Sequence, residues 1–164
     1  MVAAQQSYHI KNDNAQLVGT GQMLANEIRE LTINLPHHDP ITGSGNFGAE
    51  NNEVVGASPD PEADVINYDD LDDFAGEITA GRGAGVVFNP PINGLRLPIA
   101  DLDQWTQVVR VENVFPENLG ETDPNAIQVL GSTDMIRVTV AVQYQSPQQN
   151  VPQDVTTMTW VVSR

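Results

Sequence analysis

Apolar residues recur at helical spacing over the first 35 positions. The intervals between them are seven, seven, four, three and four positions along the series Ile10, Leu17, Leu24, Ile28, Leu31 and Leu35. Such intervals place side chains on one face of a helix, so the pattern predicts a long amphipathic helix over residues 1–35. Pro36 disfavours a helical residue before it and should end the helix at Asn34 or Leu35. Gly19 and Gly21 each weaken the helix by about 1 kcal/mol relative to alanine, so it needs a partner along its apolar face.

The last third of the chain changes to a period of two. In "DMIRVTVAVQY" one face carries the apolar side chains Ile136, Val138, Val140, Val142 and Tyr144. "VTTMTWVV" repeats the alternation with Met158, Trp160 and Val162, while "WTQVVRVENV" from Trp105 and the shorter "AIQVL" (126–130) supply further candidate strands. Strict alternation is typical of strands with one buried face. Residues 105–164 are therefore predicted to form an antiparallel sheet of three to four strands.

Between these two parts, residues 36–104 are rich in Gly, Pro, Asn and Asp and show little periodicity. Ordinary connections have about 4–6 residues, so a segment of this length predicts a structured excursion with short helices or strands, for example at "GVVF" (85–88). The order of the three parts predicts a single α+β domain in which one long N-terminal amphipathic helix packs on the sheet and a long, variable αβ loop joins them.

Charge and composition narrow the classes of partner. Seven basic residues against twenty-two acidic ones give a net charge of −15, which repels phosphate backbones, so nucleic acid is excluded as a partner. The chain has no cysteine, so disulfides are excluded as well. No window of the sequence approaches the ~18–20 continuous apolar residues of a membrane span, and "MVAAQQSYH" is not a signal peptide.

The stretch "NYDDLDDFAG" (67–76) is the most distinctive chemical feature. Its four aspartates, Asp69, Asp70, Asp72 and Asp73, repel one another unless a cation or hydrogen-bond donors compensate. Hard oxygen ligands at this density suit calcium, although the spacing does not fit an EF-hand. The alternative is a structural turn, in which Tyr68, Leu71 and Phe74 pack onto the sheet while the aspartates cap the turn or face water. A uniformly acidic and exposed cluster offers no pair of carboxylates with separated pKa values, so we expect no enzymatic activity.

Three further motifs have structural explanations. His37, His38 and Asp39 follow the helix and form a polar turn in preference to a metal site. "GSGNFG" (43–48) satisfies the dinucleotide-binding pattern but lacks the strand before it and the helix after it. "GRGAG" (81–85) has neither the lysine nor the length of a phosphate-binding loop. Both glycine-rich motifs are predicted to be loops.

Several local stretches together resemble the minor pilins and pseudopilins of type IV pili, most closely the MSHA-type minor pilins. "GQMLANEIREL" resembles the end of the pilin helix, "INYDDLDDFAGE" is similar to the acidic stretch of these proteins, and "WTQVVRVENV", "DMIRVTVAVQYQ" and "TTMTWVVSR" resemble their sheet. The resemblance covers about half of the chain. The leader, the processing-site glutamate and the apolar first half of the pilin helix have no counterpart in the sequence.

The resemblance implies a non-enzymatic structural subunit of a type IV pilus or a type II secretion-like filament. Its partners would be other pilin or pseudopilin subunits, and a removed N-terminal segment would anchor it in the inner membrane, which implies a periplasmic or cell-surface location. Residues on the outer part of the helix would face those partners, namely Val2, Ile10, Leu17 and Val18. The alternative is a secreted calcium- or carbohydrate-dependent adhesion module that uses the acidic stretch as its ligand site. No cofactor is expected except, in that reading, calcium.

Overall fold

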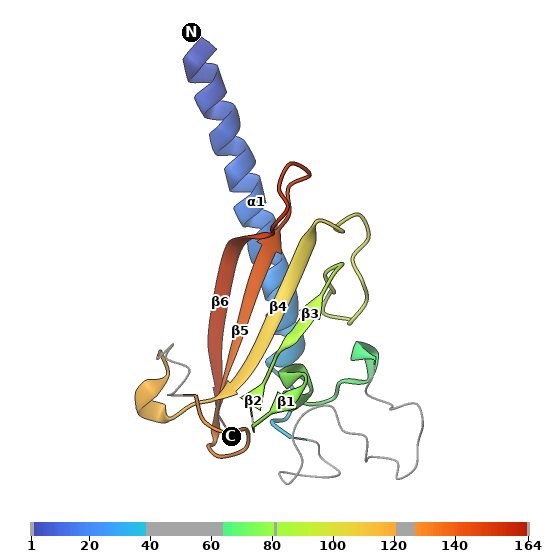
Figure 1. Ribbon diagram of the computed structural model, residues 1–164, viewed down its shortest axis with the longest axis vertical. Helices are drawn as coiled ribbons and strands as arrows, with labels where there is room; N and C mark the ends of the chain where they lie inside the picture. The colour runs from blue at the N-terminus through green and yellow to red at the C-terminus, as the bar shows by residue number, and fades with distance from the viewer. Residues whose placement is uncertain (1, 39–63, 81, 121–126, 164) are drawn as a thin grey trace.

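The computed structural model is an α+β fold with one N-terminal helix and a four-stranded antiparallel sheet. It describes residues 2–38, 64–80, 82–120 and 127–163, with side chains from residue 14 onward apart from that of residue 78. The helix α1 (Val2–Thr32) lies against one face of the sheet, and its N-terminal part extends beyond the end of the sheet (Figure 1). The predicted fold class is confirmed at this level.

The remaining described elements are short 3-10 helices, three short strands and the three long strands of the sheet. Chain order gives the 3-10 helices and strands η1 (Val65–Asn67), η2 (Asp72–Ala75), β1 (Ile78–Thr79), β2 (Arg82–Gly83), β3 (Val86–Phe88), β4 (Trp105–Asn113), η3 (Pro116–Asn118), β5 (Met135–Tyr144) and β6 (Gln153–Ser163). The strands β1 and β2 form a separate two-stranded ribbon, whereas the main sheet has the order β3-β4-β5-β6 with every pair antiparallel.

The sheet differs from the prediction at one edge. Its fourth strand is β3, inside the long connecting segment, at the "GVVF" run where the sequence predicts a short helix or strand, and there Val86 pairs with Val109 and Phe88 with Gln107. The predicted strand "AIQVL" is wrong for its described residues 127–130, which contribute a single bridge between Gln128 and Asn113. The edge of β4 available for pairing is filled by the apolar run of β3, which follows the glycine turn at Gly85.

The core lies between α1 and the inner face of the sheet. Leu24, Ile28 and Leu31 of α1 are buried, as the sequence predicts, and they join a cluster that includes the alternate residues Ile136, Val138, Val140 and Val142 of β5. On β6, the residues Met158, Trp160 and Val162 are partly buried against the same cluster. The period-two pattern therefore identified the inner face of both strands.

The helix ends slightly earlier than predicted. Its last residue is Thr32 rather than Asn34 or Leu35, and the Thr32 hydroxyl donates to the Ile28 carbonyl at 2.8 Å. The Leu35 N–H then bonds the Thr32 carbonyl at 3.2 Å, which turns the chain before Pro36. The predicted position of the end differs by only a few residues, as is common at helix termini.

A fully buried amide joins three parts of the fold. Gln107 on β4 is 0% exposed, and its Nε2 donates to the Leu24 carbonyl of α1 at 2.8 Å and to the Ile92 carbonyl at 3.1 Å. Its Oε1 accepts the Ile92 N–H at 2.8 Å. Because a buried polar group is costly unless it is bonded, these three bonds fix the helix, the sheet and the segment after β3 relative to one another.

The two helix glycines differ in their surroundings and give a matched test of the packing. An added Cβ at exposed Gly19 would meet no atom within 4 Å, whereas at buried Gly21 it would lie 3.1 Å from Val155 Cγ1 and 3.2 Å from Thr156 Cγ2 of β6. Gly19→Ala should raise the free energy of unfolding by about 0.5–1 kcal/mol through helix propensity. Gly21→Ala should give a smaller gain or a loss, because the two β6 side chains must shift. Urea unfolding measures both, and an equal gain for both variants would contradict this packing of α1 on β6.

Candidate functional site

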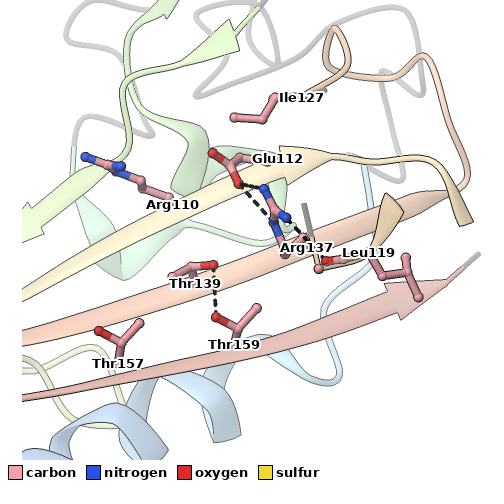
Figure 2. Close-up of a pocket in the computed structure, with 9 residues that line it drawn as sticks. Arg110, Glu112, Leu119, Ile127, Arg137, Thr139, Thr157 and Thr159 are labelled. Atoms are coloured by element: carbon pink, nitrogen blue, oxygen red, sulfur yellow. Dashed lines mark hydrogen bonds and ion pairs between the residues drawn. The ribbon is translucent and has the colours of Figure 1, made fainter. Parts of the chain in front are cut away.

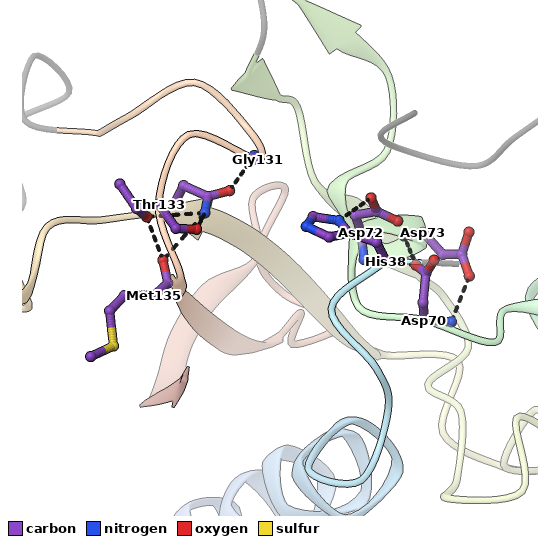
Figure 3. A network of polar contacts seen from close by, with 8 residues as sticks. His38, Asp70, Asp72, Asp73, Gly131, Thr133 and Met135 are labelled. Carbon is purple, nitrogen blue, oxygen red and sulfur yellow. Dashed lines mark hydrogen bonds and ion pairs between the residues drawn. The ribbon is translucent and has the colours of Figure 1, made fainter. Parts of the chain in front are cut away.

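The acidic stretch is a compact turn closed by reciprocal caps (Figure 3). Asp70 Oδ1 accepts the N–H groups of Asp72 at 2.9 Å and Asp73 at 3.1 Å. In return, Asp73 Oδ2 accepts the N–H groups of Asp69 at 2.8 Å and Asp70 at 3.1 Å. The reciprocal pattern is that of a capping box, placed one residue ahead of η2, whose N-cap residue is Leu71. Two of the four carboxylates are thus used to satisfy the backbone of their own turn.

The turn is held in the core by its apolar residues, as predicted. Tyr68, Leu71 and Phe74 are buried, and the rings of Tyr68 and Phe74 meet edge to face with centroids 5.0 Å apart. Of the two predicted roles for the aspartates, capping the turn is confirmed for Asp70 and Asp73. Exposure to water is wrong for Asp70, Asp72 and Asp73, which are at most 2% exposed. They are carried inward because they share a single turn with these three apolar anchors, and only Asp69 is exposed.

The segment after α1 is tied to this turn. His38 Nδ1 lies 3.1 Å from Asp72 Oδ2, and the Leu71 N–H donates to the Pro36 carbonyl at 2.9 Å. His37 and His38 therefore lie in the segment that connects the helix to the acidic turn, and His38 is paired with the buried carboxylate of Asp72. Asp39 of the same motif lies outside the described residues.

Close backbone contacts hold the other side of the turn. The Gly85 N–H donates to the Ala75 carbonyl at 2.7 Å, and an added Cβ at Gly83 would lie only 2.3 Å from that same carbonyl oxygen. Gly85 also has φ of 86°, which glycine adopts without strain. The glycines of "GRGAG" are thus explained by tight packing against η2, and the prediction of a loop is wrong at Arg82 and Gly83, which form β2. "GSGNFG" lies outside the described residues.

The carboxyl groups in this turn are not equivalent. The pKa of Asp70 is raised from its usual 3.8 to about 9, chiefly by burial and then by a hydrogen bond and like-charge repulsion with Asp72, whereas the N–H groups of Asp73 and Asp72 oppose the shift. Asp70 thus holds a proton at neutral pH. This asymmetry could not be predicted from the order of the residues, because it arises from burial.

One set of carboxylates could hold a cation. Oxygens of Asp69, Asp70 and Asp73 all lie within 4.8 Å of one another, while Asp72, the fourth member of the predicted calcium set, faces His38. A cation bound there would have to displace the Asp70 proton, so its affinity would rise with pH. The capping bonds already account for the closeness of these oxygens, and calcium at this turn stays a prediction.

The residues predicted to face partners lie on α1. Val18 is 42% exposed, whereas Leu17 is partly buried against the core, so the sheet reaches farther along the helix than expected. The preceding residues Asn14, Ala15 and Gln16 are exposed. Val2 and Ile10 belong to the helix, but their side chains lie outside those described. No helix among the described residues is long and apolar enough to cross a bilayer.

Comparison with known proteins gives no relative. No protein-family model, no curated protein and no solved structure matches this chain.

Sequence reasoning overlooked the outer face of the sheet. There the arginines Arg110 and Arg137 lie among threonines contributed by β5 and β6, and they line a cavity. The alternation that identified the inner face also assigns these residues to the opposite one. Their meeting depends on strand register, which the sequence does not specify.

The protonated state of Asp70 predicts how stability depends on pH. Because the folded pKa of about 9 exceeds the usual 3.8, folding takes up a proton between these values, and this contribution to stability is full below pH 4 and lost as pH rises toward 9. Asp70→Asn keeps an oxygen that can accept the two N–H groups and removes the titration. Its free energy of unfolding should therefore fall less than that of the wild type between pH 5 and 9.

Urea unfolding at several pH values measures this difference. Asp69→Asn is the matched control, because it removes an exposed carboxylate of the same turn, and it should retain the wild-type slope. If Asp70→Asn retained the full wild-type slope, Asp70 would not be the proton-binding group.

Proposed function

We propose that the protein is a structural subunit of a filament, of the minor pilin or pseudopilin class, with no enzymatic role. One observation carries this proposal, namely that α1 extends beyond the sheet that covers its C-terminal half (Figure 1). Among the described side chains, Leu17 is the first of α1 to pack against the core, and the three residues before it are exposed.

The physical argument concerns the stability of this extension. An isolated helix shorter than about 12–15 residues is marginal in water, and most helices in proteins depend on tertiary packing. The extension also carries Val2 and Ile10 in its sequence, and Val18 is exposed at its base. Packing against helices of neighbouring subunits would supply the missing contacts.

The division of the chain agrees with such a role. The helix would join a bundle in the filament core, and the sheet, together with the described parts of the connection that follows the helix, residues 64–80 and 82–104, would face outward. The resemblance of "GQMLANEIREL" and "INYDDLDDFAGE" to minor pilins supports this assignment. It also implies a periplasmic or cell-surface location and an inner-membrane anchor supplied by a segment ahead of α1.

Photocrosslinking in the native cells tests the proposal at residue resolution. A benzoylphenylalanine at Val18 should give a ladder of crosslinked products that contain other filament subunits. Val129, which is 51% exposed on the connection before β5, is the matched control and should crosslink much less. Equal or absent crosslinking at both positions would contradict a partner-facing helix.

A further inference from the structure

The outer face of the sheet presents polar side chains in straight rows across three strands. Strand register places Arg110 of β4 beside Thr139 of β5, and Thr139 beside Thr159 of β6. The next row joins Glu112 to Arg137. The Thr139 and Thr159 hydroxyl oxygens are 3.3 Å apart, so they form a continuous polar strip on the face opposite the core (Figure 2).

This strip forms the floor of a hollow. A cavity of about 430 Å³ is lined by the two rows, by Thr157 and by Leu119 and Ile127, a size within the range of about 300–1,000 Å³ usual for small-ligand sites. A second cavity of about 280 Å³ shares Arg110, Thr139 and Thr157 with it. A third of about 110 Å³ shares Glu112 and Ile127 and adds Arg82. We call these three adjoining cavities the outer groove.

Basic residues are concentrated in the outer groove. Arg82, Arg110 and Arg137 are three of only seven basic residues in the chain, whereas Glu112 and Asp154 are the only acidic residues among the described ones that line the three cavities. In a protein with a net charge of −15, this is a local reversal of the prevailing charge. An anionic group is therefore the ligand chemistry that the groove favours.

Two of the arginines build the groove. Arg137 is 5% exposed, and its Nε and Nη2 bond Glu112 Oε2 at 3.1 and 2.7 Å while its Nη1 donates to the Leu119 carbonyl at 3.3 Å. Arg82 Nη2 donates to the Ile127 carbonyl at 3.0 Å. These contacts fix the walls of the groove at Leu119 and Ile127. The ion pair with Arg137 also neutralises Glu112.

Arg110 is left to bind a ligand. It makes no hydrogen bond or ion pair with any residue in the described part of the chain. The aliphatic part of its side chain nevertheless lies close to Gly85, since a Cβ added at Gly85 would be 3.1 Å from Arg110 Cγ. A guanidinium presents a planar fork that matches a carboxylate. Beside it, Thr139, Thr157 and Thr159 offer hydroxyls that donate and accept hydrogen bonds.

We propose that the outer groove binds an acidic saccharide, with a uronate or sialate carboxylate on Arg110 and sugar hydroxyls on the threonine strip. A peptide fits less well, because the groove lies on the face of the sheet, where the backbone groups of β5 are already paired on both sides and cannot add a strand. None of the described residues that line the groove is aromatic, so a neutral sugar would lack a stacking surface there. This inference does not depend on the filament proposal.

Calorimetric titration of the full chain tests the proposal with a defined panel. The acidic probes are tetragalacturonate and sialyllactose. Their matched neutral probes are methyl-esterified tetragalacturonate and lactose, and hexaglutamate is the acidic peptide probe. At least one acidic saccharide should bind, and its neutral counterpart and hexaglutamate should not. Failure of both acidic saccharides, or equal binding of the neutral counterpart or of hexaglutamate, would overturn the proposal.

Variants then place the ligand in the groove. Arg110→Gln should weaken binding about tenfold or more, since it removes a charged hydrogen bond. Thr159→Val, a change that strands accept well, should weaken it several-fold. The control Arg29→Gln makes the same change of charge at an exposed position on α1, away from the groove, and should leave the affinity unchanged. Equal loss in Arg110→Gln and Arg29→Gln would show attraction by net charge alone and would overturn the assignment.

Discussion

The fold depends on the burial of one face of α1 against the inner face of the sheet. Leu24 and Ile28 of α1 and Val138 and Val140 of β5 are completely buried in this contact. Each such side chain contributes about 1.5–3 kcal/mol when it leaves water. This contact also determines which surfaces remain for other purposes, since it leaves the outer face of the sheet and the N-terminal extension of α1 outside the core.

Hydrogen bonds of buried polar groups hold the apolar elements in fixed positions relative to one another. Gln107 connects the helix to β4 and to the segment at Ile92, whereas the Asp70 and Asp73 caps close the acidic turn. Arg137 does the same on the outer face by joining Glu112 to the chain at Leu119. Because each of these groups would be costly if unpaired, the connections that they hold have defined positions.

The sequence predicts the features that are local in origin. The three- and four-residue spacing of Leu24, Ile28 and Leu31 and the alternation of Ile136 to Val142 are signals within single elements, and both identified the buried face correctly. Burial of Asp70 and Asp72 could not be anticipated, because it follows from the anchoring of the whole turn in the core. The edge strand was assigned to the wrong run because "GVVF" and "AIQVL" are both short and apolar. Three residues of "GVVF" pair with β4, whereas the described residues 127–130 make a single bridge to it.

The outer groove was missed for a similar reason, since Arg110, Thr139 and Thr159 come from three strands and meet only through register. A filament subunit that exposes its sheet would present this groove to the surroundings, while its helix extension is covered by neighbours. The two proposals thus assign different partners to different surfaces of one domain.

The central claim, that this is a pilin-class subunit, is tested most directly by mass spectrometry of the mature N-terminus of the protein purified from its native cells. The account predicts a processed chain that begins with an N-methylated residue and carries about 20 apolar residues ahead of Val2, the length that spans a bilayer. A native chain that begins at Met1, or one released by cleavage of an ordinary secretory signal, would contradict it.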